Sequence, residues 1–228
     1  MSVVLFGGEK GGSGKSTLAV SYAAMLAGKG RDVLLVDADT QASATLWVSI
    51  RAAEEVKPAI TCVSIFGDRL DAQVRALIPK YDDIVIDTRG ADSPEVRSAM
   101  LVAGIIVTPA QTSQFDIYTF AKMDKLVEQA RGFNHDLQAV AIMNRVPTNA
   151  HSSEAADMRE SLSGLRQYRL LKVFLSERKA FRRVASEGRA VTEFESPDPK
   201  AIDEMVALGR IIENPALADE DDEQEAAA

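Results

Sequence analysis

A glycine-rich stretch near the N-terminus, VVLFGGEKGGSGKSTLAV, holds two lysines, Lys10 and Lys15, in one turn. An apolar run precedes it and an amphipathic pattern follows it, which is the context of a phosphate-binding loop. Glycines let backbone N–H groups converge on phosphate oxygens, and the following helix adds partial positive charge. The candidate phosphate-binding residues are Lys10, Gly11, Gly12, Ser13, Gly14, Lys15, Ser16 and Thr17.

The two lysines require different explanations. Lys15 is placed to contact the β and γ phosphates of a nucleotide, and the Ser16 hydroxyl is placed to bind Mg²⁺. Lys10 lies outside the strict motif, and two neighbouring ammonium groups repel unless a strongly negative group lies between them. The strict motif also needs a glycine where this chain has Glu9, so a chance Gly/Ser turn is the alternative.

Three aspartates follow two other apolar runs. In DVLLVDADTQ, Asp37 and Asp39 come at the end of the apolar run. In DIVIDTRG, Asp87 comes at the end of the run. Because the carboxyl ends of parallel strands meet at one sheet edge, we expect these carboxylates beside the phosphate loop. One carboxylate there can hold Mg²⁺ and another can orient an attacking water. The alternative is that Asp39 or Asp87 caps a helix.

Short apolar runs alternate with amphipathic segments along the chain. The runs predict buried strands at residues 3–6, 32–37, 59–63, 83–87, 104–109, 139–144 and 170–175. Apolar residues at three- and four-residue spacing predict helices at 15–30, 93–104, 113–132 and 152–165. This alternation predicts a single-domain α/β fold of the P-loop NTPase type, with a doubly wound, mostly parallel sheet flanked by helices.

The composition narrows the classes of protein. No apolar run reaches the ~18–20 residues that span a bilayer, so we expect a cytoplasmic protein that does not bind a membrane. A single cysteine, Cys62, excludes a disulfide framework and a multi-cysteine metal site within one chain. The net charge is -8, and much of the excess negative charge lies in the run ADEDDEQEAAA. Residues 159–189, in contrast, carry nine basic and three acidic residues. We therefore expect a folded domain at 1–213 and an acidic, disordered tail at 214–228.

Four ordered motifs carry a resemblance to a known family: KGGSGKST, VDADTQASATLW, DDIVIDTRG and AGIIVTPAQTSQFD. The chain resembles the deviant Walker A ATPases of the ParA/MinD family, and within them the small ParA-type partition proteins that lack an N-terminal helix-turn-helix. The resemblance implies an ATPase with ATP and Mg²⁺ as cofactors, weakly active alone and stimulated by a partner. It also implies that Lys10 crosses the interface of an ATP-bound homodimer, while Lys15 serves the ATP of its own subunit.

The resemblance assigns further roles at the site. Asp39 is implied to position the hydrolytic water, so that Lys10, Lys15 and Asp39 are the catalytic residues. Asp37 and Ser16 are implied to hold Mg²⁺, and Asp87 to act on the metal through the switch loop DTRGADS. Asn144 and Arg145, in MNRVP, match the place where the family meets adenine. Where the family often has a proline, this chain has Arg89 and Gly90, so the geometry of the switch loop is an open question.

The resemblance also implies non-specific DNA binding on the nucleoid and a ParB-like adaptor, in the segregation of plasmid or chromosomal DNA. Contacts of basic residues with phosphates supply affinity without base readout. The alternative is that the basic residues only solvate a helix face. The DNA-binding candidates are Arg166, Arg169, Lys172, Lys179, Arg182 and Arg183.

Other functions remain open at this stage. The same chemistry can position a protein cargo such as a carboxysome or a chemosensory array, and a border-binding protein of conjugative DNA transfer is a near relative. From another class, a biosynthetic synthetase of the dethiobiotin type would transfer the γ-phosphate to a small substrate. A pseudo-ATPase that keeps ATP as a structural clamp is less compatible with Lys15, Ser16, Asp37 and Asp39 all being present.

Overall fold

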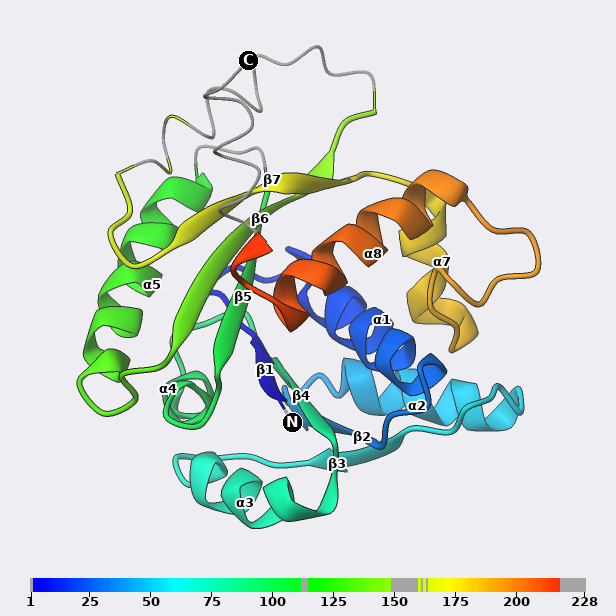
Figure 1. The fold of residues 1–228 in the computed structure, drawn as a ribbon, viewed down its shortest axis with the longest axis horizontal. Coiled ribbons are helices and arrows are strands. Elements are labelled where there is room, and N and C mark those ends of the chain that lie inside the picture. The colour runs from blue at the N-terminus through cyan, green and yellow to red at the C-terminus, as the bar shows by residue number, and fades with distance from the viewer. Residues whose placement is uncertain (1, 112–114, 149–159, 161, 163, 218–228) are drawn as a thin grey trace.

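The computed structural model describes residues 2–111, 115–148, 160, 162 and 164–217, and it contains one seven-stranded parallel sheet (Figure 1). The order of the strands across the sheet is β3-β2-β4-β1-β5-β6-β7. Their bounds are β1 Ser2–Phe6, β2 Val33–Ala38, β3 Thr61–Ser64, β4 Asp83–Thr88, β5 Ile105–Ala110, β6 Gln138–Val146 and β7 Arg169–Ser176. Every predicted strand is present, so the expected doubly wound α/β class is confirmed.

Helices cover both faces of the sheet. The helices are α1 Lys15–Gly28, α2 Ser43–Ala53, α3 Leu70–Leu77, α4 Pro94–Met100, α5 Phe115–Arg131, α7 Lys179–Glu187 and α8 Pro199–Glu213, and a 3-10 turn spans Ile78–Lys80. Alternate residues of each central strand point to opposite faces. Residues such as Val4 and Phe6 pack under α1, α2, α7 and α8, whereas Val3 and Leu5 pack under α3, α4 and α5. Two apolar layers therefore hold the central strands in place.

The helices agree less well with the sequence prediction. Helices α1, α4 and α5 fall within predicted segments, but α2, α3 and α8 were not predicted. Helix α8 buries residues at helical spacing, including Ala201, Met205 and Leu208, so its pattern was available in the sequence. Most of the helix predicted at 152–165 lies outside the described residues, as do residues 218–228 of the acidic tail predicted at 214–228.

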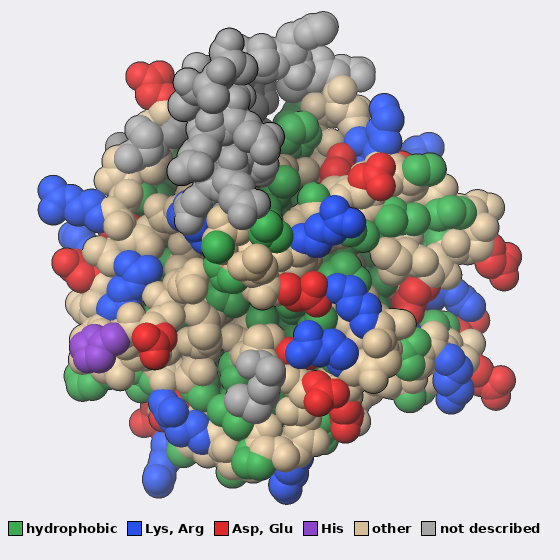
Figure 2. Space-filling view, in the orientation of Figure 1, with side chains coloured by type: hydrophobic (Ala, Val, Ile, Leu, Met, Phe, Trp, Pro, Cys, Tyr) green, Lys and Arg blue, Asp and Glu red, His purple; other side chains and the backbone are tan. Residues whose placement is uncertain are grey.

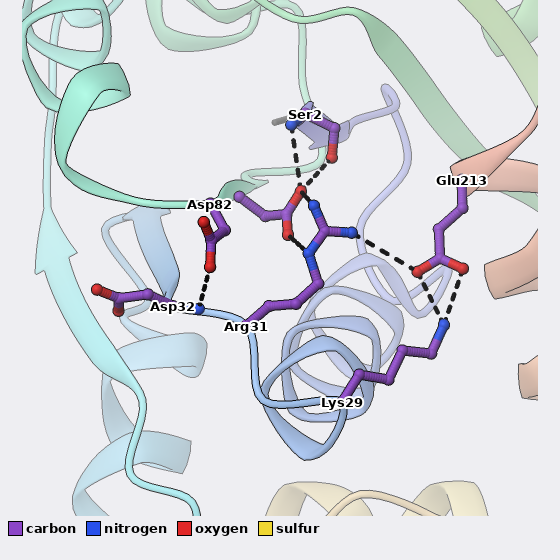
Figure 3. A network of polar contacts seen from close by, with 7 residues as sticks. Ser2, Lys29, Arg31, Asp32, Asp82 and Glu213 are labelled. Atoms are coloured by element: carbon purple, nitrogen blue, oxygen red, sulfur yellow. Dashed lines mark hydrogen bonds and ion pairs between the residues drawn. The ribbon is translucent and has the colours of Figure 1, made fainter.

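A polar network at the amino edge of the sheet joins four segments that are distant in sequence (Figure 3). The buried carboxylate of Asp83 accepts hydrogen bonds from Ser2 N (3.1 Å), Ser2 Oγ (2.6 Å) and Arg31 Nη2 (2.9 Å). Arg31 Nε forms an ion pair with the other carboxylate oxygen of Asp83, Oδ2, at 2.6 Å. Nearby, Lys29 Nζ lies 2.8 Å from Glu213 Oε2, which links the ends of α1 and α8. The network ties β1 and β4 together at the edge opposite their functional ends.

We predict that Arg31→Met lowers the free energy of unfolding by about 2–4 kcal/mol, because it removes a charged partner from a buried carboxylate. Lys29→Met is the matched control, since Lys29 is half exposed and a surface ion pair contributes only about 0–1 kcal/mol. Urea unfolding of both variants measures the difference. Equal losses of stability would contradict the importance of the buried Asp83.

Candidate functional site

The loop between β1 and α1 has the backbone of an anion-binding turn. Gly12 and Gly14 adopt positive φ angles of 74° and 101°, which glycine tolerates best. Gly14 is the N-cap of α1 and has no side chain, so no side chain caps the first N–H groups of this helix. These N–H groups and the positive end of the helix dipole point to the same place.

Lys15 is buried beneath this loop rather than extended into solvent. Its Nζ donates to the carbonyl of Lys10 at 2.8 Å, and Ser13 Oγ lies 3.3 Å from the same carbonyl. Burial lowers the pKa of Lys15, while the nearby carboxylates of Asp87 and Asp39 oppose that shift. The backbone of Lys10 thus anchors Lys15, whereas the Lys10 side chain is only partly buried.

The three predicted carboxylates meet beside this loop. Asp37 and Asp87 are directly paired in the register of β2 and β4, and Phe6 of β1 pairs with Asp87 on the other side. Asp37 accepts hydrogen bonds from Asp39 N (3.1 Å) and Thr45 N (2.7 Å), so it caps the first turn of α2. Asp39 lies just beyond β2, where its carboxylate accepts from Gln41 N at 2.9 Å.

Asp87 differs from the other two carboxylates because it is fully buried and lacks partners. Neither of its oxygens has a hydrogen bond of full geometry with any described residue, although the Ser16 hydroxyl is close enough to influence it. Burial, together with Asp37 and Asp39, raises the pKa of Asp87 to about 7, and Ser16 and Lys15 oppose the rise. A buried carboxylate without a partner is costly. Its position beside Ser16 fits a divalent cation, which binds preferentially to oxygen ligands.

We predict that Asp87→Asn stabilises the ligand-free protein. The pKa of Asp87 is raised in the folded state, from 3.8 to about 7. The native protein therefore binds more protons than the unfolded chain between these pH values, and stability falls as pH rises through the window. We expect a gain of about 1–3 kcal/mol in the free energy of unfolding at pH 8 and a smaller gain at pH 5, where only the lower part of the window has been crossed.

Urea unfolding at the two pH values, without nucleotide, measures this gain. Asp203→Asn, on the exposed face of α8, is the control for the loss of one carboxylate. A stability change in Asp87→Asn that is the same at pH 5 and pH 8 would show that the carboxylate is not strained in the native state.

The loop after β4 lies against the phosphate loop. A Cβ added at Gly90 would lie 2.5 Å from Lys10 C, Lys10 O and Gly11 N, all of them backbone atoms. The two backbones therefore approach too closely for a side chain at position 90. Lys122 Nζ of α5 pairs with Glu9 Oε1 at 2.6 Å, so Glu9, the departure from the strict motif, has an ion-pair partner.

A cavity of about 270 Å³ opens next to the phosphate loop, between the ends of β6 and β7 and helix α7. The predicted pair Asn144 and Arg145 lies on its wall, but Asn144 is buried and donates to the Ser13 carbonyl at 2.6 Å. The sequence prediction missed Glu177 and Phe181, whose only signal was proximity to a basic segment. The lining residues are Gly14, Thr17, Leu18, Asn144, Arg145, Ser176, Glu177, Arg178, Phe181, Arg182 and Ala185.

The predicted DNA-binding residues do not form one patch. Arg166 and Arg169 lie at the amino end of β7 and Lys172 lies within that strand, whereas Lys179, Arg182 and Arg183 lie on α7 beyond its carboxyl end. The eight residues of β7, at ~3.3 Å per residue, place Arg169 about 23 Å from the carboxyl end of the strand, and Lys172 lies between. On the face shown in Figure 2, basic and acidic side chains are interspersed.

Two of the three basic side chains on α7, Arg182 and Arg183, lie close to acidic side chains. Arg183 donates to both carboxylate oxygens of Glu187 and stacks over Phe194, with its guanidinium carbon 4.2 Å from the ring centre. Arg182 lines the cavity and lies 3.6 Å from Glu177 Oε1. Lys179 is exposed in the first turn of α7. These contacts make Lys179 the clearest probe of a phosphate-contacting role.

A phosphate loop at the carboxyl edge of a parallel sheet, with acidic strand ends beside it, defines a P-loop nucleotide-binding fold. Residues 4–191 match the family model for the CobQ/CobB/MinD/ParA nucleotide binding domain. The chain therefore belongs to this family, and the resemblance to ParA/MinD proteins is confirmed. This is a family of nucleotide-binding P-loop ATPases.

Individual relatives agree with this assignment. Protein ParA of Rhizobium radiobacter is 28% identical over 167 residues, covering 71% of this chain and 72% of the relative. Maintenance of carboxysome distribution protein A of Gloeobacter kilaueensis is 30% identical over 193 residues, covering 81% of each. The fold also matches the septum site-determining protein MinD of Pyrococcus horikoshii, solved with Mg-ADP, with a TM-score of 0.71, 20% identity and coverage of 94% and 97%.

Among the residues that the structure describes, no helix is both long enough and apolar enough to span a bilayer.

Proposed function

We propose that this chain is an ATP-hydrolysing positioning protein that dimerises around bound ATP and moves a cargo along DNA. The observation that carries the proposal is the buried, unpartnered Asp87 beside Lys15 and the uncapped N-terminus of α1. At this place the Asp87 carboxylate requires a cation, and the first N–H groups of α1 require an anion. A triphosphate with a divalent cation satisfies both, because the N–H groups and Lys15 bind the phosphates and the carboxylate binds the cation.

The residues around this point divide the chemistry of hydrolysis. Ser16 and Asp87 would hold Mg²⁺, which neutralises charge on the β and γ phosphates. Asp37 is a weaker candidate for direct coordination, because both of its oxygens already accept backbone N–H groups. Asp39 is partly exposed at the end of β2 and accepts one backbone hydrogen bond, which leaves carboxylate capacity to orient an attacking water.

The role of Lys10 follows from its position in the loop. Its carbonyl accepts the hydrogen bond of Lys15, so its backbone belongs to the subunit's own phosphate site. Its side chain is partly exposed. In the dimer that the family resemblance implies, this side chain would neutralise the phosphates of the ATP held by the partner subunit.

We predict that Lys15→Ala lowers ATP affinity by at least tenfold, because it removes the buried cation of the subunit's own site. Lys10→Ala should retain ATP binding within about threefold but fail to dimerise with ATP. Isothermal titration measures binding, and analytical ultracentrifugation measures dimerisation. The proposal fails if Lys10→Ala and wild type dimerise equally with ATP, or if wild type binds no ATP.

The exposed cations of α7 support a DNA-binding surface at the same edge of the molecule. Lys179 and Arg182 lie on one helical face, and Arg182 also lines the cavity beside the phosphate loop. Because Arg182 belongs both to this surface and to the cavity, we expect DNA binding to depend on whether a nucleotide occupies the cavity. The relatives include a protein named ParA and a protein named for the maintenance of carboxysome distribution, so the proposed cargo is DNA or a protein body attached through an adaptor.

We predict that Lys179→Glu weakens retention on non-specific DNA. The negative slope of log affinity against log salt should become less steep by about 1, because one phosphate contact is lost. Lys200→Glu is the matched control, since Lys200 is also exposed in the first turn of a helix. Filter binding at several salt concentrations, with ATP present, measures both. Equal behaviour of the two variants would remove α7 from the DNA-binding surface.

A further inference from the structure

We propose that Arg51 is a positioning residue through which the nucleotide site acts on α7. Helix α2 is the connection between the two. Its first turn is held by Asp37 beside the phosphate loop, and Arg51 in its last turn holds the C-terminal end of α7. The inference rests on the proposed nucleotide and DNA binding, and it adds the physical link by which the first controls the second.

The guanidinium of Arg51 is buried, and each of its five N–H groups has an acceptor. Only 1% of the residue is exposed. Nη1 and Nη2 donate to the two carboxylate oxygens of Glu193 at 2.8 and 2.7 Å. Nη1 also donates to Gly188 O at 3.0 Å, and Nε and Nη2 donate to Pro58 O at 3.0 and 2.9 Å. Its guanidinium carbon lies 5.1 Å from the ring centre of Trp47, one turn earlier on α2.

The turn that ends α7 also touches the backbone of α2 directly. Gly188 is the C-cap of α7, with a φ of 60°. A Cβ added there would lie 2.4 Å from Arg51 N and 2.7 Å from Arg51 Cα. Glu193 Oε2 accepts a second hydrogen bond from Ala190 N at 2.8 Å, which closes this turn around the guanidinium. The end of α7 and the last turn of α2 therefore move together.

The first turn of α2 is tied to the nucleotide site by a single carboxylate. Asp37 accepts hydrogen bonds from Thr45 N in that turn at 2.7 Å and from Asp39 N at 3.1 Å. Asp39 is the residue proposed to orient the attacking water. Helix α2 has 11 residues and is about 16 Å long. Because a helix is a rigid element, a displacement at Asp37 reaches Arg51 at its other end.

Stability alone does not explain a charged pair at this place. Replacing a buried ion pair by apolar side chains of similar volume is often neutral or stabilising. Apolar packing was available here, since Trp47 of α2 and Val184 of α7 belong to the same buried layer. Apolar contact is non-directional, whereas the planar fork of an arginine fixes the orientation of its acceptors. The pair of Arg51 and Glu193 therefore indicates that the relative position of α2 and α7 has to be exact.

Movement of α7 changes the surface that we propose for DNA. This helix lies beside α2 and carries Lys179 and Arg182 (Figure 1). The segment held by Arg51 supports α7 a second time, because the buried Phe194 follows Glu193 directly. The guanidinium carbon of Arg183 lies 4.2 Å from the ring centre of Phe194. A shift of this segment therefore displaces the basic residues of α7 relative to the rest of the molecule.

Two conservative variants test the link. Arg51→Lys keeps the positive charge but lacks the planar fork, and Glu193→Gln keeps the shape but lacks the negative charge. Arg31→Lys is the matched control, because it weakens another buried ion pair, with Asp83, in which neither α2 nor α7 takes part. Circular dichroism establishes that each variant is folded, and isothermal titration gives its ATP affinity, which should stay within about threefold of wild type.

Hydrogen exchange of the α7 amides, with and without saturating Mg²⁺-ATP, is the first measurement. We expect ATP to change these exchange rates in wild type and in Arg31→Lys, and to leave them unchanged in Arg51→Lys and Glu193→Gln. The second measurement is the ratio of DNA affinities with and without ATP. That ratio should fall by at least about fivefold in the two α2–α7 variants and stay at the wild-type value in Arg31→Lys.

The outcomes separate this inference from the proposed function. Equal responses to ATP in wild type, Arg51→Lys and Glu193→Gln would overturn the inference, as would a wild-type α7 that does not respond to ATP. Loss of the response in Arg31→Lys as well would assign the effect to stability and overturn it too. If Arg51→Lys does not fold, Glu193→Gln decides.

The proposed function has its own failure. If wild type binds no ATP, the proposed function fails and the inference fails with it. If ATP binds and alters α7 exchange through Arg51 but DNA is not retained, the inference stands and only the DNA-binding part of the proposed function is lost.

Discussion

The arrangement of the site depends on one constraint, the parallel register that places Asp87 between the ends of β1 and β2. Phe6 and Asp37 are its two register partners, so the carboxylate emerges directly beside the phosphate loop. The protein keeps this carboxylate buried without a hydrogen-bonding partner. The surrounding sheet can bear that cost because its central strands are packed on both faces by large apolar layers.

Three contacts from separate parts of the chain then hold the phosphate loop in shape. Gly90 lies against its backbone from the β4 side, Lys122 pairs with Glu9 from α5, and Asn144 bonds to the Ser13 carbonyl from β6. Each contact fixes a different portion of the loop. The loop is consequently ordered from outside, while its own glycines supply the backbone conformation.

The sequence predicted the parts of this structure that depend on local pattern. The strands were visible because their residues are apolar on both faces, and the carboxyl-edge rule placed Asp37, Asp39 and Asp87 near Lys15. The contacts of Asn144 and Gly90 were not predictable, because each joins segments that are far apart in sequence. The separation of Arg169 from Lys179 by β7, in contrast, followed from the strand predicted at 170–175, although the charge count along residues 159–189 took no account of that strand.

Helices α2 and α3 show a second limit of sequence pattern. Helix α2 begins after Ala42, whose positive φ of 53° gives no signal in an alanine, and α3 has only eight residues. Tertiary contacts determine such elements more than propensity does. Asp37 illustrates this, since its carboxylate caps the first turn of α2 from a neighbouring strand.

The strand order also constrains how the molecule is made on the ribosome. Strand β1 is central, flanked by β4 and β5, so it cannot pair with either neighbour until the chain has grown past residue 88. The glycine-rich turn that follows it gains its support from β6 only after residue 144 has emerged. Until residue 88 has been synthesised, the nascent chain therefore carries an apolar strand without its sheet neighbours, and an exposed strand of that kind favours aggregation.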